Sequence, residues 1–323
     1  MVRIAIIGAG RMGKLHSGIV KELPGAELAG IYDLSKQAAE ALAAERGTKV
    51  YLAPEEIMAD PDVDAVVLCH PTFAHYQALR LFLPTGKYIL GEKPMVRHRG
   101  EAEAIRREPN AATRLAIGFM RRQQPAYQKI KEWIDDGTLG AVRMVKVGCN
   151  VAGYKRLWDD WFADFSLCGG VPLDMLSHHF NLLNWYFGVP QRVSGAGLMF
   201  DRPMELPADY ISGTFVYPDG MIANIDGSWQ RQGVGYDRIE VYGDRATALF
   251  DQKDLLLCRP GQNEKIDLGS PIKPYEEQMK AFVATVAAGG VPAIGVEDGY
   301  WAFRTADALI QAAQSGQTVT IQE

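Results

Sequence analysis

The chain has 323 residues, of which 47% are hydrophobic and 23% charged, with a formal net charge of −5 and a pI near 5.8. This length exceeds what one hydrophobic core usually serves, so we expect two ordered domains. The acidic balance disfavours nucleic acid as a partner, and no apolar run approaches the roughly 20 residues that cross a bilayer. We therefore expect a cytoplasmic protein with no membrane partner.

The four cysteines lie far apart and form no C-x-x-C pair. This spacing indicates neither a disulfide framework nor a structural zinc site. We expect reduced thiols at Cys69, Cys149, Cys168 and Cys258.

Up to about residue 120, apolar β-branched segments alternate with segments of helical spacing. Ser35 and Gly47 have the residue types that cap the two ends of a helix. The alternation predicts a doubly wound parallel sheet, a Rossmann domain over residues 1–120. We expect strands at 2–7, 26–33, 48–52, 64–68, 87–90 and 113–118, and helices at 14–23, 35–47, 73–83 and 98–108.

Residues 121–323 have a different texture, because alternating strands dominate after two early helices. Pro218-Asp219-Gly220 and Gly243-Asp244 are hairpin signals. We expect an α+β domain with a large, mostly antiparallel sheet. Its expected helices are 125–136, 170–187, 273–288 and 296–314, and its expected strands are 140–149, 191–200, 208–217, 221–230, 237–243, 246–251 and 254–258.

A G-x-G-x-x-G motif, formed by Gly8, Gly10 and Gly13, joins the first strand to the first helix. The glycines permit a tight turn, close approach of a pyrophosphate and close helix packing, while the helix N-terminus faces the anion. Asp33 ends the second strand, where a carboxylate accepts from a ribose hydroxyl. Because that charge would repel a 2′-phosphate, we expect NAD, with NADP as the alternative that nearby Lys36 keeps open.

Glu92-Lys93-Pro94 follows the fifth expected strand, at the sheet edge where ligands of parallel sheets bind. The proline restricts the backbone of Lys93 and so the direction of its ammonium group. Asp174 and His178 stand four residues apart, which on a helix puts both on one face. A carboxylate, an imidazole and an ammonium group together suit hydride transfer from an alcohol, in which one group removes the hydroxyl proton and another stabilises charge on oxygen.

Several motifs together resemble the Gfo/Idh/MocA family along nearly the whole chain. They are GAGRMG at the first turn, YD at 32–33, EKP at 92–94, GFMRR at 118–122 and GG-x-x-x-D-x-x-x-H from Gly169 to His178. The segment after GFMRR is most similar to the inositol-2-dehydrogenase-like branch.

The resemblance implies a catalytic group of Lys93, Asp174 and His178. His178 would be the principal acid and base, Lys93 would hold the reacting oxygen, and Asp174 would anchor the substrate. It also implies that the C-terminal sheet is open-faced and pairs subunits into a homodimer or homotetramer. The implied cofactor-binding residues are Gly8, Gly10, Arg11, Met12, Gly13, Asp33, His70, Glu92 and Lys93, and the implied substrate-binding residues are Arg121, Asn150, Trp161, Asn181 and Tyr236.

The sequence departs from the inositol enzymes at two places. Their His-x-Asn segment corresponds to Cys149-Asn150-Val151, and the aspartate one turn after their catalytic histidine corresponds to Asn181. These changes remove polar contacts to a polyol and put myo-inositol in doubt. A sugar or related cyclitol remains the expected substrate class.

Three other interpretations compete. A short-chain dehydrogenase would use Tyr127 and Lys131, but its glycine spacing differs. A metal enzyme using Asp174, His178 and His75 lacks compact ligand spacing, so we expect no metal. A non-catalytic dinucleotide-binding sensor of the same fold stays open as the alternative, and a Lys93→Met variant would discriminate it from an enzyme.

Overall fold

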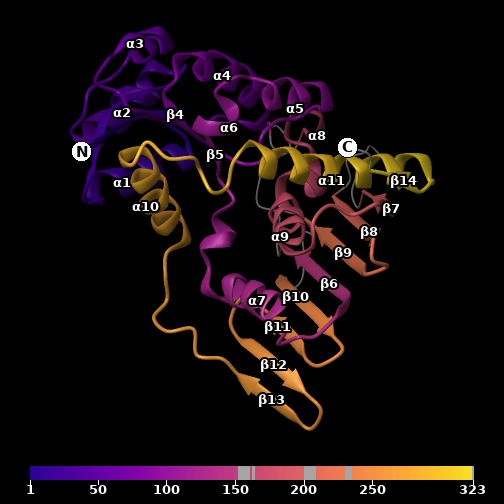
Figure 1. Ribbon diagram of the computed structural model, residues 1–323. Coiled ribbons are helices and arrows are strands. Elements are labelled where there is room, and N and C mark those ends of the chain that lie inside the picture. The colour runs from indigo at the N-terminus through magenta and orange to yellow at the C-terminus, as the bar shows by residue number, and fades with distance from the viewer. Residues whose placement is uncertain (152–160, 162–163, 200–208, 230–234, 322–323) are drawn as a thin grey trace. The chain divides into compact units, whose positions relative to one another are not determined.

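The computed structural model describes residues 1–151, 161, 164–199, 209–229 and 235–321 (Figure 1). The chain divides into two compact units. The first contains Met1–Met120 and Lys273–Tyr300, and the second contains Arg121–Ile272 and Trp301–Glu323. None of the helices in the described ranges is both long and apolar enough to span a membrane.

The first unit is built on a five-stranded parallel sheet of order β2-β1-β3-β4-β5. This confirms the predicted parallel, helix-covered sheet. Ser35 accepts from the backbone N–H of Ala38 at the start of one helix and Gly47, with φ of +69°, ends it, as expected. The strands are β1 (Val2–Ile7), β2 (Ala26–Tyr32), β3 (Ala65–Leu68), β4 (Tyr88–Gly91) and β5 (Leu115–Ile117), and the helices are α1 (Arg11–Glu22), α2 (Lys36–Arg46), α3 (Pro54–Ala59), α4 (His75–Phe82), α5 (Arg99–Arg106) and α6 (Ala111–Arg114).

The strand expected at 48–52 is wrong, because this segment makes a single parallel bridge between Val50 and Ile31. Two backbone hydrogen bonds flank it, from Ile31 to Lys49 at 3.0 Å and from Tyr51 to Ile31 at 2.9 Å. Pro54 then begins α3 and ends any further pairing. With this bridge included, the order of parallel segments is that of a dinucleotide-binding sheet.

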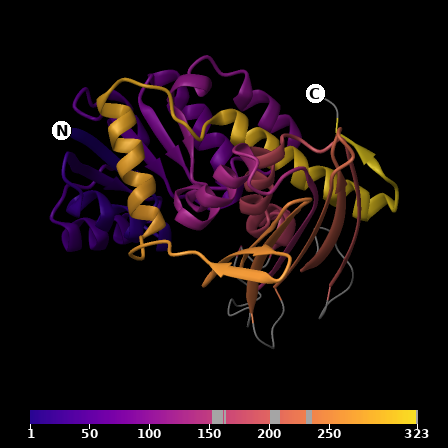
Figure 2. The same ribbon diagram turned by 60° about the horizontal axis from the view of Figure 1, so that its bottom comes forward.

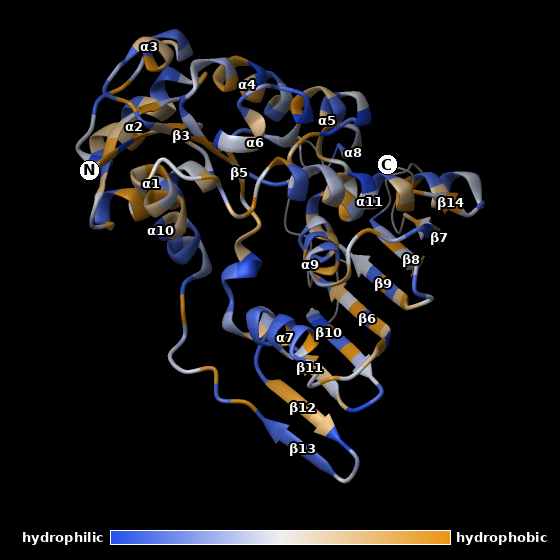
Figure 3. Ribbon diagram, viewed as in Figure 1, coloured by the Kyte–Doolittle hydropathy of each residue, from blue (hydrophilic) through white to orange (hydrophobic). Residues whose placement is uncertain are grey.

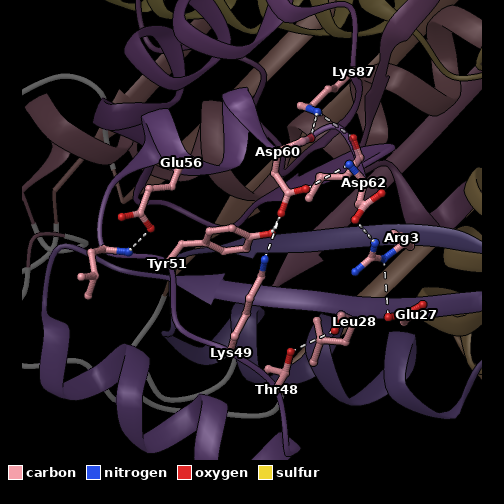
Figure 4. Close-up of polar contacts among 12 residues, drawn as sticks. Arg3, Glu27, Leu28, Thr48, Lys49, Tyr51, Glu56, Asp60, Asp62 and Lys87 are labelled. Atoms are coloured by element: carbon pink, nitrogen blue, oxygen red, sulfur yellow. Dashed lines mark hydrogen bonds and ion pairs between the residues drawn. The ribbon is translucent and has the colours of Figure 1, made fainter.

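Side chains, rather than a ladder, hold this segment (Figure 4). Lys49 Nζ and the Tyr51 hydroxyl donate to Asp60 Oδ2 at 2.9 and 2.8 Å, and these hydrogen bonds keep the pKa of Asp60 well below its ordinary value. Lys87 Nζ donates to the carbonyl oxygens of Asp60 and Val63, each at 2.7 Å. The cluster precedes β3 and so lies at the amino ends of the strands, whereas ligands of parallel sheets bind at the carboxyl ends. Its role is therefore structural.

Helix α10 (Pro274–Ala287) belongs to the first unit, although the expected boundary assigned residues 273–300 to the second (Figures 1 and 2). Its apolar side chains Met279, Phe282 and Val283 are buried in one cluster with β1 residues Val2 and Ile4. The helix therefore supplies part of the core beneath the parallel sheet.

The second unit contains a nine-stranded sheet of order β13-β12-β11-β10-β6-β9-β8-β7-β14. Every pair is antiparallel except β6 and β9, which confirms the predicted mostly antiparallel sheet. Both expected hairpins form. The strands are β6 (Val142–Asn150), β7 (Arg192–Leu198), β8 (Tyr210–Val216), β9 (Ile222–Ser228), β10 (Tyr236–Gly243), β11 (Thr247–Phe250), β12 (Leu255–Arg259), β13 (Gln262–Lys265) and β14 (Val319–Thr320), and the helices are α7 (Pro125–Asp135), α8 (Phe165–Cys168), α9 (Ser177–Phe187) and α11 (Val296–Ser315), the last of which crosses the division between units.

One face of this sheet is covered by α9, and we call it the helix-covered face; the other is the open face. Phe180 of α9 packs on Phe215 of β8, with ring centroids 5.5 Å apart, and a Cβ on Gly227 of β9 would lie 2.8 Å from Leu176. Figure 3 shows the alternation of polar and apolar residues along β6 that this arrangement requires. Cys149 is buried on the helix-covered face, and Asn150 therefore lies on the open face.

The helix expected over 170–187 is not continuous. Val171–Met175 form a π-helical turn, in which the Leu176 N–H donates to the Val171 carbonyl, and α9 begins only at Ser177. Gly170, with φ of +64°, precedes this turn, and Pro172 lies in the first turn, where a missing N–H is tolerated. Asp174 and His178 are consequently not separated by one regular α-helical turn.

Candidate functional site

The glycine motif lies between β1 and α1, beside the point where the strand order reverses. Gly8 has φ of +104°, and a Cβ on Gly13 would lie 1.8 Å from the Gly8 carbonyl oxygen. A Cβ on Gly10 would meet nothing within 4 Å. The first and third glycines are thus required by the fold itself, whereas the second borders open space.

The first turn of α1 has no side-chain cap, so its backbone N–H groups stay available to a ligand. In that turn Arg11 is exposed and Met12 half-buried. Asp33 Oδ2 accepts from the Ala9 N–H at 2.7 Å, and its Oδ1 accepts from Ser35. The expected ribose-binding carboxylate is therefore fixed against the glycine loop.

Glu92, Lys93 and Pro94 follow β4 at the same edge of the sheet, and the Lys93–Pro94 peptide is cis. Lys93 is half-buried. Glu92 is buried, and its Oε1 lies 2.7 Å from Nε2 of His16 on α1. Burial acts to raise the pKa of Glu92, but the hydrogen bond from His16 and the neighbouring positive charges lower it below its usual value. No local pattern around His16 indicates this contact, beyond its place in the first helix.

Two histidines follow β3 at this edge. His70 is half-buried, burial lowers its pKa to about 4, and its Nδ1 has no hydrogen-bond partner among the described residues. His75, weighed above only as a metal ligand, is buried with Nδ1 2.7 Å from the Pro94 carbonyl oxygen and Nε2 3.0 Å from that of His70. Both of its ring nitrogens are engaged by protein oxygens.

The second unit holds the D-x-x-x-H pair. Asp174 is half-buried in the π-helical turn, and His178 is buried near the start of α9. Single π turns inside helices occur frequently at functional sites.

The neighbouring His179, which the sequence reasoning set aside, lies at the centre of a buried network. Its Nε2 is 2.9 Å from Asp237 Oδ1 and 3.0 Å from Arg121 Nη1. Arg121 also pairs with Asp237 and donates to the Tyr127 hydroxyl at 2.9 Å. Burial acts to raise the pKa of Asp237, but hydrogen bonds and charges from His179 and Arg121 keep that pKa well below its ordinary value. Arg121, expected to bind substrate, therefore has its charge balanced inside the protein.

This network argues against the short-chain-dehydrogenase interpretation, and it contains a set of possible metal ligands other than Asp174, His178 and His75. Burial raises the pKa of Tyr127 to about 12, and its hydroxyl is bonded to Arg121 and Gln252, so it cannot serve as a short-chain-dehydrogenase acid. Cys149, His179 and Asp237 offer ligand atoms within 4.8 Å of one another. The guanidinium of Arg121 already supplies the positive charge there.

Asn150 and Tyr236 lie directly opposite one another on β6 and β10. Because Asp237 and its partner Cys149 lie on the helix-covered face, these two side chains lie on the open face, away from His179. The Tyr236 ring lies over Gly148, and both the Tyr236 hydroxyl and Asn150 Nδ2 donate to Asp226 Oδ2, at 3.3 and 3.4 Å.

The two remaining expected substrate residues lie elsewhere. Asn181 of α9 is 1% exposed, and within the described ranges neither atom of its amide has a partner. Trp161 is half-buried, and its carbonyl accepts from Asp164. Most of the aromatic segment at 150–168 lies outside the described residues.

Family models match both parts of the chain. Residues 2–117 match an oxidoreductase family with an NAD-binding Rossmann fold, and residues 127–249 match the GFO/IDH/MocA C-terminal domain.

Individual relatives extend over the full chain. It is 29% identical to inositol 2-dehydrogenase of Rhizobium meliloti (strain 1021), over 99% of both chains. It is 31% identical to scyllo-inositol 2-dehydrogenase (NAD(+)) of Bacillus subtilis (strain 168), over 75% of this chain and 71% of that protein.

Solved structures show the same fold. A levoglucosan dehydrogenase in complex with NADH has a TM-score of 0.88 at 18% identity, covering 100% of this chain and 99% of its own. A myo-inositol dehydrogenase from Corynebacterium glutamicum ATCC 13032 has a TM-score of 0.83 at 22% identity, with the same coverage.

Proposed function

Because the chain belongs to the Gfo/Idh/MocA family of oxidoreductases, we propose that it is an NAD-dependent dehydrogenase that oxidises a secondary hydroxyl of a sugar or cyclitol, or reduces the corresponding ketone. The proposal depends on one observation: the expected cofactor-binding and catalytic segments of the first unit all lie at the carboxyl edge of the parallel sheet. There the glycine loop follows β1, Asp33 follows the adjacent β2, and the Lys93 segment follows β4, with β3 between β1 and β4. The relatives named above are inositol dehydrogenases, and they suggest the substrate class.

The first unit fits a dinucleotide. Gly10 borders open space, the first turn of α1 has no side-chain cap, and His70 has a buried nitrogen with no partner in the described part of the chain. The pyrophosphate would be held by the loop of Gly8, Gly10, Arg11, Met12 and Gly13, and the adenosine ribose by Asp33. His70, Glu92 and Lys93 would lie towards the nicotinamide. Glu92 would be held in place there by its hydrogen bond with His16. When bound, the nicotinamide accepts or supplies the hydride.

Side chains of the protein would remove and return the hydroxyl proton of the substrate. His178 would take the hydroxyl proton as the C–H hydride departs, and would return it in the reverse direction. Lys93 would donate a hydrogen bond to the same oxygen and stabilise its developing negative charge. Asp174 would hold the substrate and orient His178.

The substrate is best described as an uncharged polyol. Since Asp237 balances Arg121, an anionic substrate gains no free cation there. Asn181 supplies a donor and an acceptor that a hydroxyl can satisfy. Trp161 would add contacts beyond the reacting centre, whereas Asn150 and Tyr236 lie on the open face, opposite α9, and are not assigned to the substrate.

Two further features form part of the proposal. The open face of the nine-stranded sheet would pair subunits into a homodimer or homotetramer. The protein would act in the cytoplasm, consistent with four cysteines that lie far apart in the sequence and form no C-x-x-C pair.

The test is a panel of inositols, free sugars and sugar acids with NAD⁺ or NADP⁺, comparing the wild type with Lys93→Met and the exposed-lysine control Lys21→Met. We expect turnover in the wild type and Lys21→Met, strongest with NAD⁺, and loss in Lys93→Met with dinucleotide binding retained. Dinucleotide binding without turnover across the panel would favour the non-catalytic sensor instead.

A further inference from the structure

His75 contacts the segment that carries Lys93, through the carbonyl oxygen of Pro94. It is the first residue of α4 and is 3% exposed. Its Nδ1 faces the carbonyl oxygen of Pro94, the residue after Lys93, at 2.7 Å, and its Nε2 faces that of His70 at 3.0 Å. One imidazole thus links the loops after β3 and β4.

The chemistry of these partners restricts the proton on His75. Carbonyl oxygens only accept hydrogen bonds, and a neutral imidazole has one N–H. Since the Pro94 contact is shorter, the neutral ring would carry its proton on Nδ1, and only the imidazolium would bond both carbonyls. Burial and the charge of Lys93 lower the pKa of His75, while the two carbonyls and the carboxylate of Glu92 raise it.

A second buried contact fixes the other side of the same segment. Glu92, immediately before Lys93, is held by His16 of α1, and its Oε2 would lie 3.2 Å from a Cβ on Gly118. The backbone around Lys93 is therefore tied to α1 through Glu92 and to α4 through Pro94.

We propose that His75 is a positioning residue for Lys93: by donating from Nδ1 to the Pro94 carbonyl, it fixes the backbone from which the reacting ammonium group extends. The inference rests on the proposed role of Lys93. Misplacing a catalytic group by about 1 Å can cost on the order of 100-fold in rate. His75 itself acts on the substrate only through Lys93.

Nitrogen NMR of ¹⁵N-histidine-labelled protein tests the geometry without any substrate. The His75 signals are identified by their loss in His75→Gln. We expect Nδ1 to be protonated at neutral pH, in the Nδ1–H tautomer or the imidazolium. An Nε2–H tautomer with bare Nδ1 would overturn the proposal.

Kinetics test the consequence, using the most active substrate of the panel. In His75→Leu we expect kcat to fall about 10- to 100-fold, NADH affinity to stay within about threefold, and the kcat–pH profile to shift. His75→Asn, whose amide nitrogen takes the position of Nδ1 and can donate to the same carbonyl, should recover part of kcat. Gln77→Leu, on the exposed side of α4, should match the wild type.

Normal kcat in folded His75→Leu, or equal losses in kcat and NADH affinity with an unchanged pH profile, would contradict the inference. If His75→Leu does not fold, the kcat of His75→Asn and the NMR tautomer decide. Lys93→Met separates this inference from the proposed function. Full turnover in Lys93→Met contradicts the role of Lys93, whereas loss in Lys93→Met with normal kcat in His75→Leu contradicts the positioning role alone.

Discussion

His16 Nε2 lies 2.7 Å from Glu92 Oε1, so the helix that follows the glycine motif is joined inside the first unit to the residue before Lys93. Removing one partner of a buried pair leaves the other uncompensated, at a cost of about 3–5 kcal/mol. We expect His16→Leu to lower the free energy of unfolding by that order, measured by urea denaturation at pH 7. A change below about 1 kcal/mol would contradict a stabilising buried contact between His16 and Glu92.

The same pair predicts acid sensitivity. The pKa of Glu92 is lowered in the folded protein from its ordinary value of 4.5, so its contribution is fully present above that value and is lost as pH falls through the folded pKa. Glu92→Gln should weaken the dependence of stability on pH below about 4.5. Denaturation curves at pH 7 and pH 4 measure this, and an identical pH dependence in both proteins would argue against it.

Gly8 and Gly13 are required by the fold, whereas Gly10 is expected to matter for cofactor binding. Gly13→Ala would place a methyl group 1.8 Å from the Gly8 carbonyl, and such overpacking costs about 1–3 kcal/mol or more. Gly10→Ala meets nothing within 4 Å, so it should keep the melting temperature and weaken NADH binding only. Thermal denaturation and NADH fluorescence titration distinguish the two effects. A large stability loss in Gly10→Ala would refute the distinction.

Asp33 should determine cofactor preference. We expect Asp33→Asn to lower the ratio of kcat/KM for NAD⁺ over NADP⁺ about tenfold, or ~1.4 kcal/mol, since the repulsion of a 2′-phosphate is removed. Lys36 provides a second variant for comparison. Its side chain is exposed, and its Nζ lies 3.7 Å from Glu40 Oε1. Lys36→Met should reduce any use of NADP⁺ and spare NAD⁺. An unchanged ratio in Asp33→Asn would mean that other residues select the cofactor.

The buried pair of Arg121 and Asp237 should matter for stability more than for substrate charge. Asp237→Asn leaves Arg121 without its carboxylate, and we expect a loss of about 3–5 kcal/mol in urea denaturation. Lys265→Met, which removes an exposed pair with Asp254 in the same sheet, should cost less than about 1 kcal/mol. Equal effects of the two substitutions would contradict the buried network.

Local patterns predicted most of the fold. The alternation of strands and helices, the glycine spacing and the turn residues depend on neighbours in the sequence, and the structure has these elements near their expected ranges. The prediction of a strand at 48–52 was wrong. It depended on the β-branched composition of the segment, which does not show that Pro54 begins a helix before a ladder of hydrogen bonds can form.

Contacts between distant residues were harder to predict. Nothing local to His16 indicates Glu92, and nothing local to His179 indicates Asp237 on a strand far along the chain. One signal was present: because successive residues on a helix face different directions, His178 and His179 could not share a role. The expected substrate residues Asn150 and Arg121 likewise fall on opposite faces of the sheet, which only its register reveals.

The return of α10 to the first unit has a consequence for synthesis. The ribosome makes residues 121–272 before it reaches Met279, Phe282 and Val283, which complete the core around Val2 and Ile4. At about 5–20 residues per second, the nascent first unit waits on the order of ten seconds or more with that apolar surface uncovered. During translation this surface is where a chaperone would bind, and a chain ending at Met120 would keep it exposed permanently.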